Sequence, residues 1–360
     1  MYDILFLADA QDLWLFNYFL LASNQNGSHL KIIYDKTGKV TSPHTVLGGL
    51  KECGISQENL IRYEGSDSTN FKENIANCRW FITKDFLPTG LDDAFLRKCI
   101  VVSWVGESAR LESHNPRHGI VRPGYQKLYV EKSIQPLYTF LGFTSHVMIP
   151  KYYFLNHFNR EIICNNFNLD PTKKYVTIFS NPFFDSRADV ADKKDTALND
   201  RVGKIFSNIK DFCQKNDIQI ILKNKAKYAH VFSDTIFHHK YVAGNPGLAH
   251  PGVMLMAISE FSLGFATSAV IEAEEIGARF ISFWKHDFQK VDESLFQDIL
   301  VHHHGQHYRL AQGDDTFIVN TGDTLDDIMV NLDLFMKNSK PIEISRVETD
   351  SFLKENFGDF

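Results

Sequence analysis

Residues 260–284 have the sequence EFSLGFATSAVIEAEEIGARFISFW, and this stretch decides the fold. Its apolar beginning, Phe261–Phe265, predicts a short strand that ends in a turn of small residues at 266–268. The residues that follow predict a helix from about Ala269 to Ile276. Gly277 supplies the residue that most easily ends a helix, and a second apolar strand then runs to the end of the stretch.

The turn between this strand and this helix is a predicted site for an anion. Thr267 or Ser268 can cap the helix, and the first N–H groups of a helix have no partner inside it. The helix dipole adds partial positive charge at the same end. We therefore expect Thr267, Ser268 and the N–H of Ala269 to contact a phosphate or diphosphate.

Strands and helices alternate along the chain, which is typical of α/β proteins with parallel sheets. The first strand, Asp3–Ala8, leads to a helix without a GxGxxG turn, which argues against a dinucleotide-dependent dehydrogenase. An Asn-rich stretch near residues 151–173 breaks the alternation, and Tyr175–Phe179 then starts a second set of strands. We expect two Rossmann-like domains that face each other across a cleft. The predicted units are a first domain at residues 1–160, a second domain at 170–335, and a tail at 341–360 that crosses back to the first domain.

The composition is that of a globular protein with two cores. Of the 360 residues, 44% are hydrophobic and 23% are charged, and the formal charge of −6 argues against a nucleic-acid partner. Five scattered cysteines without a CxxC motif indicate reduced thiols and a cytoplasmic location. No run approaches the roughly 20 apolar residues of a membrane span, and the start lacks the basic region of a signal peptide. Membrane association, at the inner face, is therefore expected to be peripheral only.

The same stretch resembles a known motif. Glu272-Ala273, three further residues, Gly277 and a strand look like the donor-sugar motif in the second domain of GT-B glycosyltransferases. The turn at Thr267-Ser268 resembles the Ser-Ser turn of bacterial capsule and teichoic-acid transferases. The resemblance implies that Glu272 holds the ribose of a nucleotide-activated sugar.

Two positions depart from this motif. Retaining members of the family carry a second Glu where this chain has Gly264, so the resemblance implies an inverting enzyme. The usual Pro after the Gly-x turn is replaced by Arg279.

Other residues that follow predicted strands are further donor-site candidates. Ser180 and Asn181 form a polar turn after the first strand of the second domain. Lys223 matches the first position of a Lys-x-His-Pro motif found at a comparable place in capsule-type families. A cation there can face a donor phosphate, although an exposed lysine at the end of a strand is an equally good interpretation.

In the first domain, the candidates for the catalytic base and for acceptor binding also follow strands. Inversion needs a group that takes the proton of the attacking acceptor hydroxyl. Asp9 and Glu107 are the candidates for that base, with Asp9 favoured because it directly follows the first strand. Asp12, which can instead cap the next helix, and Arg110 are the candidates for acceptor binding.

The sequence leaves several functions open. The leading hypothesis is a metal-independent, inverting glycosyltransferase of polysaccharide biosynthesis. It is expected to use a nucleotide sugar as donor substrate and a glycan or lipid-linked glycan as acceptor, and to need no cofactor. A zinc site in His302–His307 is not expected, because adjacent histidines cannot all face one ion. Alternatives of the same architecture are a sugar-nucleotide 2-epimerase and an alditol-phosphate transferase, although Val105 replaces the His of the Trp-His-Gly motif of the latter. A non-catalytic nucleotide-sugar-binding module is the alternative from a different class.

Overall fold

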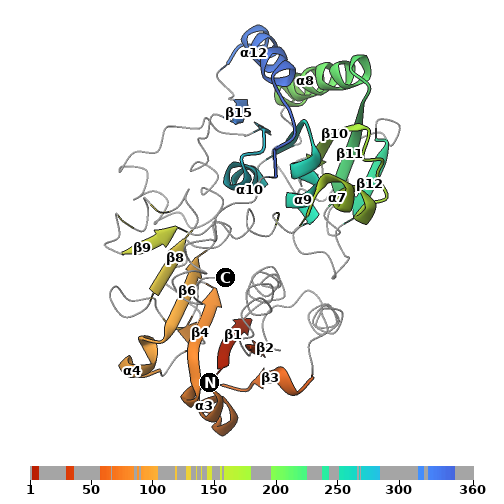
Figure 1. Cartoon of the computed structure of the whole chain (residues 1–360). Coiled ribbons are helices and arrows are strands. Elements are labelled where there is room, and N and C mark those ends of the chain that lie inside the picture. Colours follow the sequence, from red (N-terminus) through yellow and green to blue (C-terminus); the bar gives the residue numbers. More distant parts are fainter. Residues whose placement is uncertain are drawn as a thin grey trace.

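The computed structural model places two separate parallel β-sheets in the chain (Figure 1). The residues that it describes are 2–7, 30–35, 57–65, 67–84, 87–88, 91–103, 118–119, 127–130, 135, 139, 144–147, 155, 158–179, 196–224, 237–242, 251–265, 267, 269–283, 315–319 and 323–344.

The first sheet has seven strands in the order β3-β2-β1-β4-β6-β8-β9, and every neighbouring pair is parallel. Within the described residues, two α-helices, the 3-10 helix η2 Gln57–Asn59 and a short antiparallel pair accompany it. The strands are β1 Tyr2–Leu7, β2 Leu30–Asp35, β3 Leu60–Tyr63, β4 Cys78–Lys84, β6 Cys99–Ser103, β8 Lys127–Val130 and β9 Ser145–Val147, the helices are α3 Thr69–Ala76 and α4 Asp93–Leu96, and the antiparallel pair is β5 Leu87–Pro88 with β7 His118–Gly119.

Aromatic side chains build the core beneath β1 and β4. The ring of Phe6 stacks on Phe81 at 5.7 Å, and the edges of Tyr63 and Phe71 complete the cluster. Asp3 is a buried charge in β1, 1% exposed, and it is compensated because Arg79 donates to both of its carboxylate oxygens, at 3.0 and 2.7 Å. This ion pair joins the amino ends of two adjacent strands.

The second sheet has six parallel strands in the order β12-β11-β10-β13-β14-β15. The strands are β10 Lys174–Phe179, β11 Ile218–Asn224, β12 His239–Val242, β13 Phe261–Phe265, β14 Phe280–Phe283 and β15 Thr316–Val319, and the helices are α7 Arg160–Asn166, α8 Thr196–Lys215, α9 Pro251–Ile258, α10 Ala269–Ile276 and α12 Leu325–Lys337.

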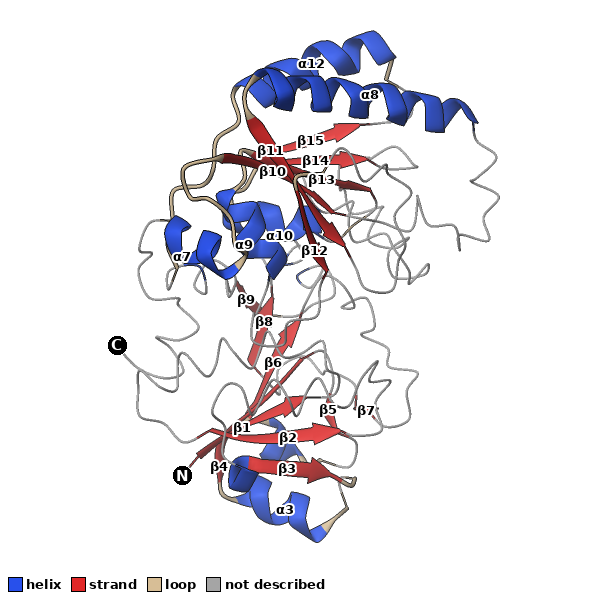
Figure 2. Ribbon diagram, turned by 90° about the vertical axis from the view of Figure 1, so that its right-hand side faces the viewer, coloured by secondary structure: helices blue, strands red, loops and turns tan. Residues whose placement is uncertain are grey.

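Helices cover both faces of this second sheet (Figure 2). Along β10, Val176 and Ile178 point into the layer formed by α8 and α12, whereas Tyr175 and Phe179 point toward α9 and α10. Helix α9 is apolar all round and buried, because it lies between β10, α7 and α10. In both views, α8 and α12 lie on the side of this sheet away from the first sheet.

The predicted fold class is confirmed in that the chain forms two α/β units, each with a parallel sheet. The strand, helix and strand of the organising stretch lie where the sequence predicts them, as β13, α10 and β14. The predicted cleft, the domain limits and the crossing of the tail stay predictions.

The Asn-rich stretch at the predicted boundary contains a helix, α7, that the sequence analysis does not predict. Asn159 caps its first turn, where the side chain accepts a hydrogen bond from the N–H of Ile162 at 2.8 Å. Asn168 ends it with a left-handed φ of 54°. Two asparagines of this stretch, Asn159 and Asn168, therefore mark the two ends of a short helix.

Candidate functional site

The turn between β13 and α10 lies at the carboxyl edge of the second sheet, between β10 and β14. The helix begins at Ala269, and Thr267 supports its start. The N–H of Ala269 donates to the Thr267 hydroxyl at 3.3 Å, and the N–H of Val270 donates to the Thr267 carbonyl at 3.3 Å. Both bonds are longer than the distance of about 3.0 Å that is typical of N–H···O bonds, so each of them is weak.

The side chain of Thr267 folds back onto the end of β13. It is 6% exposed, and its methyl group occupies the space above Gly264. A Cβ built on Gly264 would lie 2.6 Å from Thr267 Cγ2, well inside contact distance. The turn is therefore packed directly on the strand that precedes it.

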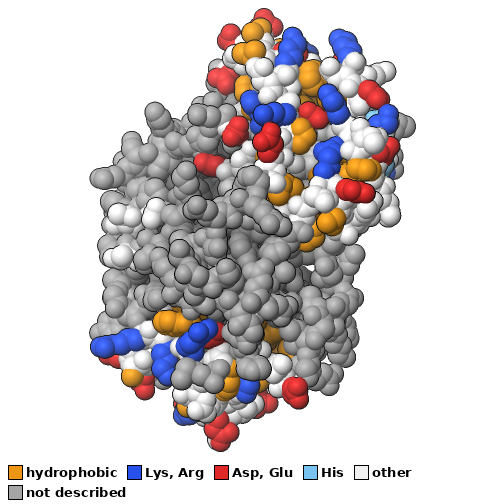
Figure 3. All heavy atoms as spheres, in the orientation of Figure 1, with side chains coloured by type: hydrophobic (Ala, Val, Ile, Leu, Met, Phe, Trp, Pro, Cys, Tyr) orange, Lys and Arg blue, Asp and Glu red, His pale blue; other side chains and the backbone are white. Residues whose placement is uncertain are grey.

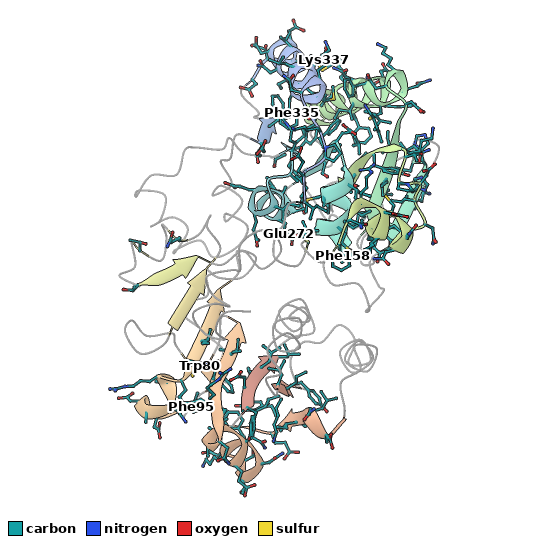
Figure 4. All side chains as sticks on the ribbon, viewed as in Figure 1. Trp80, Phe95, Phe158, Glu272, Phe335 and Lys337 are labelled. Atoms are coloured by element: carbon teal, nitrogen blue, oxygen red, sulfur yellow. The ribbon has the colours of Figure 1, made fainter. Side chains whose placement is uncertain are left out.

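Glu272 lies in the first turn of α10, where its negative charge is favoured by the helix dipole. Its side chain is partly buried. Figure 4 shows it in the layer of the second domain that lies nearest the first sheet. A carboxylate at this place can accept two hydrogen bonds, as the neighbouring hydroxyls of a ribose require.

The carboxyl end of α10 is fixed by a glycine cap. Gly277 has a left-handed φ of 70°, and its N–H donates to the Glu274 carbonyl at 3.2 Å. The N–H of Ala278 donates to the Ala273 carbonyl at 2.8 Å, which completes a Schellman motif. Glu272 lies in the first turn of α10, so the helix geometry sets its distance from Ala269.

Lys223 lies on the same edge of the sheet. It stands opposite Phe179 in β10, and Phe179 stands opposite Gly264 in β13. Adjacent strands are about 4.8 Å apart, so the backbones of Lys223 and Gly264 are roughly 10 Å apart. The stem of Lys223 passes the start of α9, where its Cε would lie 3.5 Å from a Cβ on Gly252, and its ammonium lies 5.8 Å from the Phe179 ring.

The structure thus describes four of the predicted donor-site residues and brings them to one sheet edge: Lys223, Thr267, Ala269 and Glu272. The other predicted site residues lie outside the described residues: Asp9, Asp12, Glu107, Arg110, Ser180, Asn181 and Ser268. The His302–His307 stretch lies outside them as well.

Two contributions at this edge were not anticipated from the sequence. Gly264 appears in the motif only as a departure, yet its missing side chain gives room to Thr267. Gly252 likewise gives room to Phe179, whose Cε1 would lie 3.1 Å from a Cβ there. The first contact joins residues three positions apart in the chain, whereas the second depends on how α9 packs against β10, which no local sequence signal reveals.

A hollow of about 520 Å³ lies at the opposite end of α10 and is lined by residues of both charges, among them Glu274, Arg279, Asp315 and Lys340. The Arg279 guanidinium lies over the Phe335 ring at 4.2 Å and donates to the Asn338 carbonyl at 3.5 Å. An eight-residue helix is about 12 Å long, so this hollow is separate from the turn at the start of α10.

Most groups with a clearly shifted pKa lie away from this sheet edge. Burial raises the pKa of the Cys78 thiol to about 11 and that of Cys213 to about 12. Burial also raises the pKa of Glu260, at the amino end of β13, despite the nearby charges of Lys174 and Arg160. These shifts follow from packing and indicate no proton-transfer role.

Three properties of the described residues concern charged, metal and membrane partners. On the face in Figure 3, cationic and anionic side chains of the second domain are interspersed. Within the described ranges, no group of three His, Cys, Asp or Glu side chains could hold a metal ion. No helix in the described part of the chain is both long enough and apolar enough to cross a membrane.

Comparison with known proteins gives distant structural similarities only. No family model and no curated protein matches the sequence. Among solved structures, the chain is similar to the E. coli ADP-heptose LPS heptosyltransferase II, at 8% identity and a TM-score of 0.40 over 94% of this chain and 99% of that one. It is also similar to the wall teichoic acid polymerase TagF, at 10% identity and a TM-score of 0.45 over 93% and 89%, and to S. aureus MnaA bound to UDP, at 9% identity and a TM-score of 0.40 over 94% and 97%.

One of these neighbours is named as a heptosyltransferase and another as a teichoic acid polymerase. Their TM-scores are all below 0.5, so they carry no argument about activity. The fold class rests on the strand orders and pairings of the chain itself.

Proposed function

We propose that this chain is a glycosyltransferase that moves a sugar from a nucleotide-activated donor to a glycan or glycolipid acceptor. The observation that supports it most is the edge of the second sheet, where the start of α10, Thr267, Lys223 and Glu272 lie together. A helix start and a cation attract a diphosphate, and a carboxylate one turn into the helix suits a ribose.

The same arrangement supports departure of the nucleotide without a metal ion. The leaving diphosphate gains negative charge as the sugar is transferred. Preorganised N–H groups, a helix dipole and a lysine stabilise such charge without reorganising. We propose that the N–H groups of α10 and the ammonium of Lys223 act in this way.

The catalytic base is proposed to come from the first domain. Strand β1 ends at Leu7, two positions before Asp9, and β6 ends at Ser103, four positions before Glu107. Only β4 lies between these two strands, and all three are parallel. The carboxyl ends of β1 and β6 therefore lie at the same sheet edge roughly 10 Å apart, and Asp9 and Glu107, which follow them in the chain, are both kept as candidates.

Substitution at both positions tests this assignment. Asp9→Asn and Glu107→Gln keep the shape of the side chain but remove its basicity. Loss of the true base should lower kcat by about 100-fold or more while donor affinity stays near normal. Full activity in both variants would contradict the assignment.

The experiment that tests the proposed function is a thermal-shift screen against UDP, GDP, CDP, CMP and their sugars. A ligand that binds the native state at 100 times its Kd stabilises it by about 2.7 kcal/mol, so a true donor raises the unfolding midpoint clearly. The donor found is then incubated alone and with candidate acceptors. Transfer that needs an acceptor supports the proposal, whereas interconversion of the nucleotide sugar alone would identify an epimerase. Binding without turnover would identify a binding module.

A further inference from the structure

Gly264 is required for space and not for backbone conformation. The positive φ values of the described glycines are at Gly65 and Gly277, so the backbone of Gly264 would accept another residue. A Cβ on Gly264 would however lie 2.6 Å from Thr267 Cγ2, 3.2 Å from Phe179 Cβ and 3.3 Å from Phe280 Cζ. Even alanine is therefore too large for this position in the present arrangement.

The neighbours of Gly264 differ in how easily they can move. Phe179 and Phe280 are 6% and 0% exposed, and their rings contact each other at 5.9 Å in the core below. Thr267 lies in a turn and accepts hydrogen bonds from the N–H groups of Ala269 and Val270, both at 3.3 Å. An added methyl group would therefore displace the turn rather than the core.

We infer that Gly264 and Thr267 form a positioning pair that sets where the helix start meets the phosphate groups of a nucleotide. The Thr267 methyl rests in the space above Gly264, and its hydroxyl accepts from the first N–H of α10, so the height of the turn above the sheet fixes the position of that N–H. Neither residue needs to touch the ligand for this effect. The inference rests on the proposed function, because it concerns the same nucleotide site.

A methyl group can be moved across this contact to test the pair. Gly264→Ala adds a methyl group on the strand, and Thr267→Ser removes one from the turn while the hydroxyl stays. The double variant Gly264→Ala/Thr267→Ser has the same atoms as the wild type, with the methyl group on the other side of the contact. Nucleotide affinity is measured by calorimetry for all four proteins, using the nucleotide that the thermal-shift screen identifies, at a temperature well below each unfolding midpoint.

Gly264→Ala should weaken binding by about 10-fold or more, because Thr267 must move from 2.6 Å to at least the 3.4 Å of ordinary contact. In the Thr267→Ser background the same Gly264→Ala substitution should weaken binding by less than about 3-fold, which makes the two substitutions strongly non-additive. A merely structural role for Gly264 would not give this recovery of affinity.

Two control variants distinguish a shift in the position of the helix start from a general loss of folding stability. Gly203→Ala makes the same change on α8, where a Cβ meets nothing within 4 Å, and should bind normally. Leu332→Ala removes a fully buried side chain of α12 and should lower the unfolding midpoint without weakening binding. Normal binding by Gly264→Ala, or weak binding that the double variant does not restore, would overturn the inference alone. Absence of nucleotide binding by the wild-type chain would overturn the proposed function and the inference with it.

Discussion

Arg160 ties the first turn of α7 to the second domain through three backbone carbonyls. Its guanidinium donates to Pro171 at 2.9 Å, to Ile258 at the end of α9 at 2.8 Å, and to Lys173 just before β10 at 2.5 Å. Two of these carbonyls belong to the loop before β10 and the third to the end of α9, so one side chain joins three segments of the chain. We expect Arg160→Ala to destabilise the second domain by about 2–3 kcal/mol.

The magnitude follows from the exposure of each bond. The bond to Pro171 is exposed, so water can replace it at little cost. The two partly buried bonds contribute about 1–1.5 kcal/mol each. The Tyr175 ring, 5.9 Å from the guanidinium, adds about 0.5 kcal/mol, and removal of a positive charge from the start of a helix returns about 0.3 kcal/mol.

Thermal unfolding and amide hydrogen exchange measure this loss. For a unit of this size, about 2–3 kcal/mol corresponds to a midpoint lower by roughly 5–10 °C, with faster exchange of the α7 amides. Arg160→Lys keeps the charge but not the planar fork, and should lose about half as much. The control is Lys337→Ala, which breaks an exposed pair with Asp333 and should cost below about 0.5 kcal/mol. A loss for Arg160→Ala no larger than that of the control would refute the reasoning.

Three further predictions follow from buried titratable groups. The pKa of Glu260 is raised mainly by burial, so its charge destabilises the folded state above about pH 4.3. Glu260→Gln should therefore raise the unfolding midpoint at pH 7. A gain that persists at pH 3.5 would contradict this cause. The pKa of His239 is lowered, mainly by burial and also by the nearby His238. The stability of the wild type should therefore fall relative to that of His239→Gln as the pH drops below about 6.5. Parallel profiles of stability against pH for the two proteins would contradict this. Four cysteines are buried thiols with raised pKa values: Cys78, Cys99, Cys164 and Cys213. Brief alkylation of the native chain should leave them unmodified, as mass spectrometry would show. Their reaction before the chain unfolds would disprove their burial.

The sequence predicts both sheets because their central strands are apolar and long enough to recognise. The segment from Phe261 to Phe283 is predicted almost to the residue, since a turn of small residues and Gly277 mark the ends of α10. Shorter or more polar elements are not predicted from the sequence. Strand β12 contains His239 and Lys240 at the sheet edge, and α3 buries Phe71 alone, so neither shows a clear apolar period.

The candidate site is only partly predictable, for a different reason. The motif indicates Thr267 and Glu272 because their roles depend on local spacing along one helix. The contact between Thr267 and Gly264 is local, but the row that joins Gly264 to Lys223 through Phe179 depends on sheet order and register. Register joins residues that are far apart in the chain, and a single sequence contains no signal for it.

Nucleotide affinity of Glu272→Ala is the most direct test of the account. Calorimetry with the nucleotide identified by the screen should show a loss of about 1–3 kcal/mol, roughly 5- to 150-fold in Kd, because two hydrogen bonds from ribose hydroxyls to a carboxylate disappear. Glu275→Ala removes the same charge from the other end of α10, beside the hollow, and should bind like the wild type. Unchanged affinity in Glu272→Ala, or equal losses in both variants, would show that this helix does not hold the donor in the proposed way.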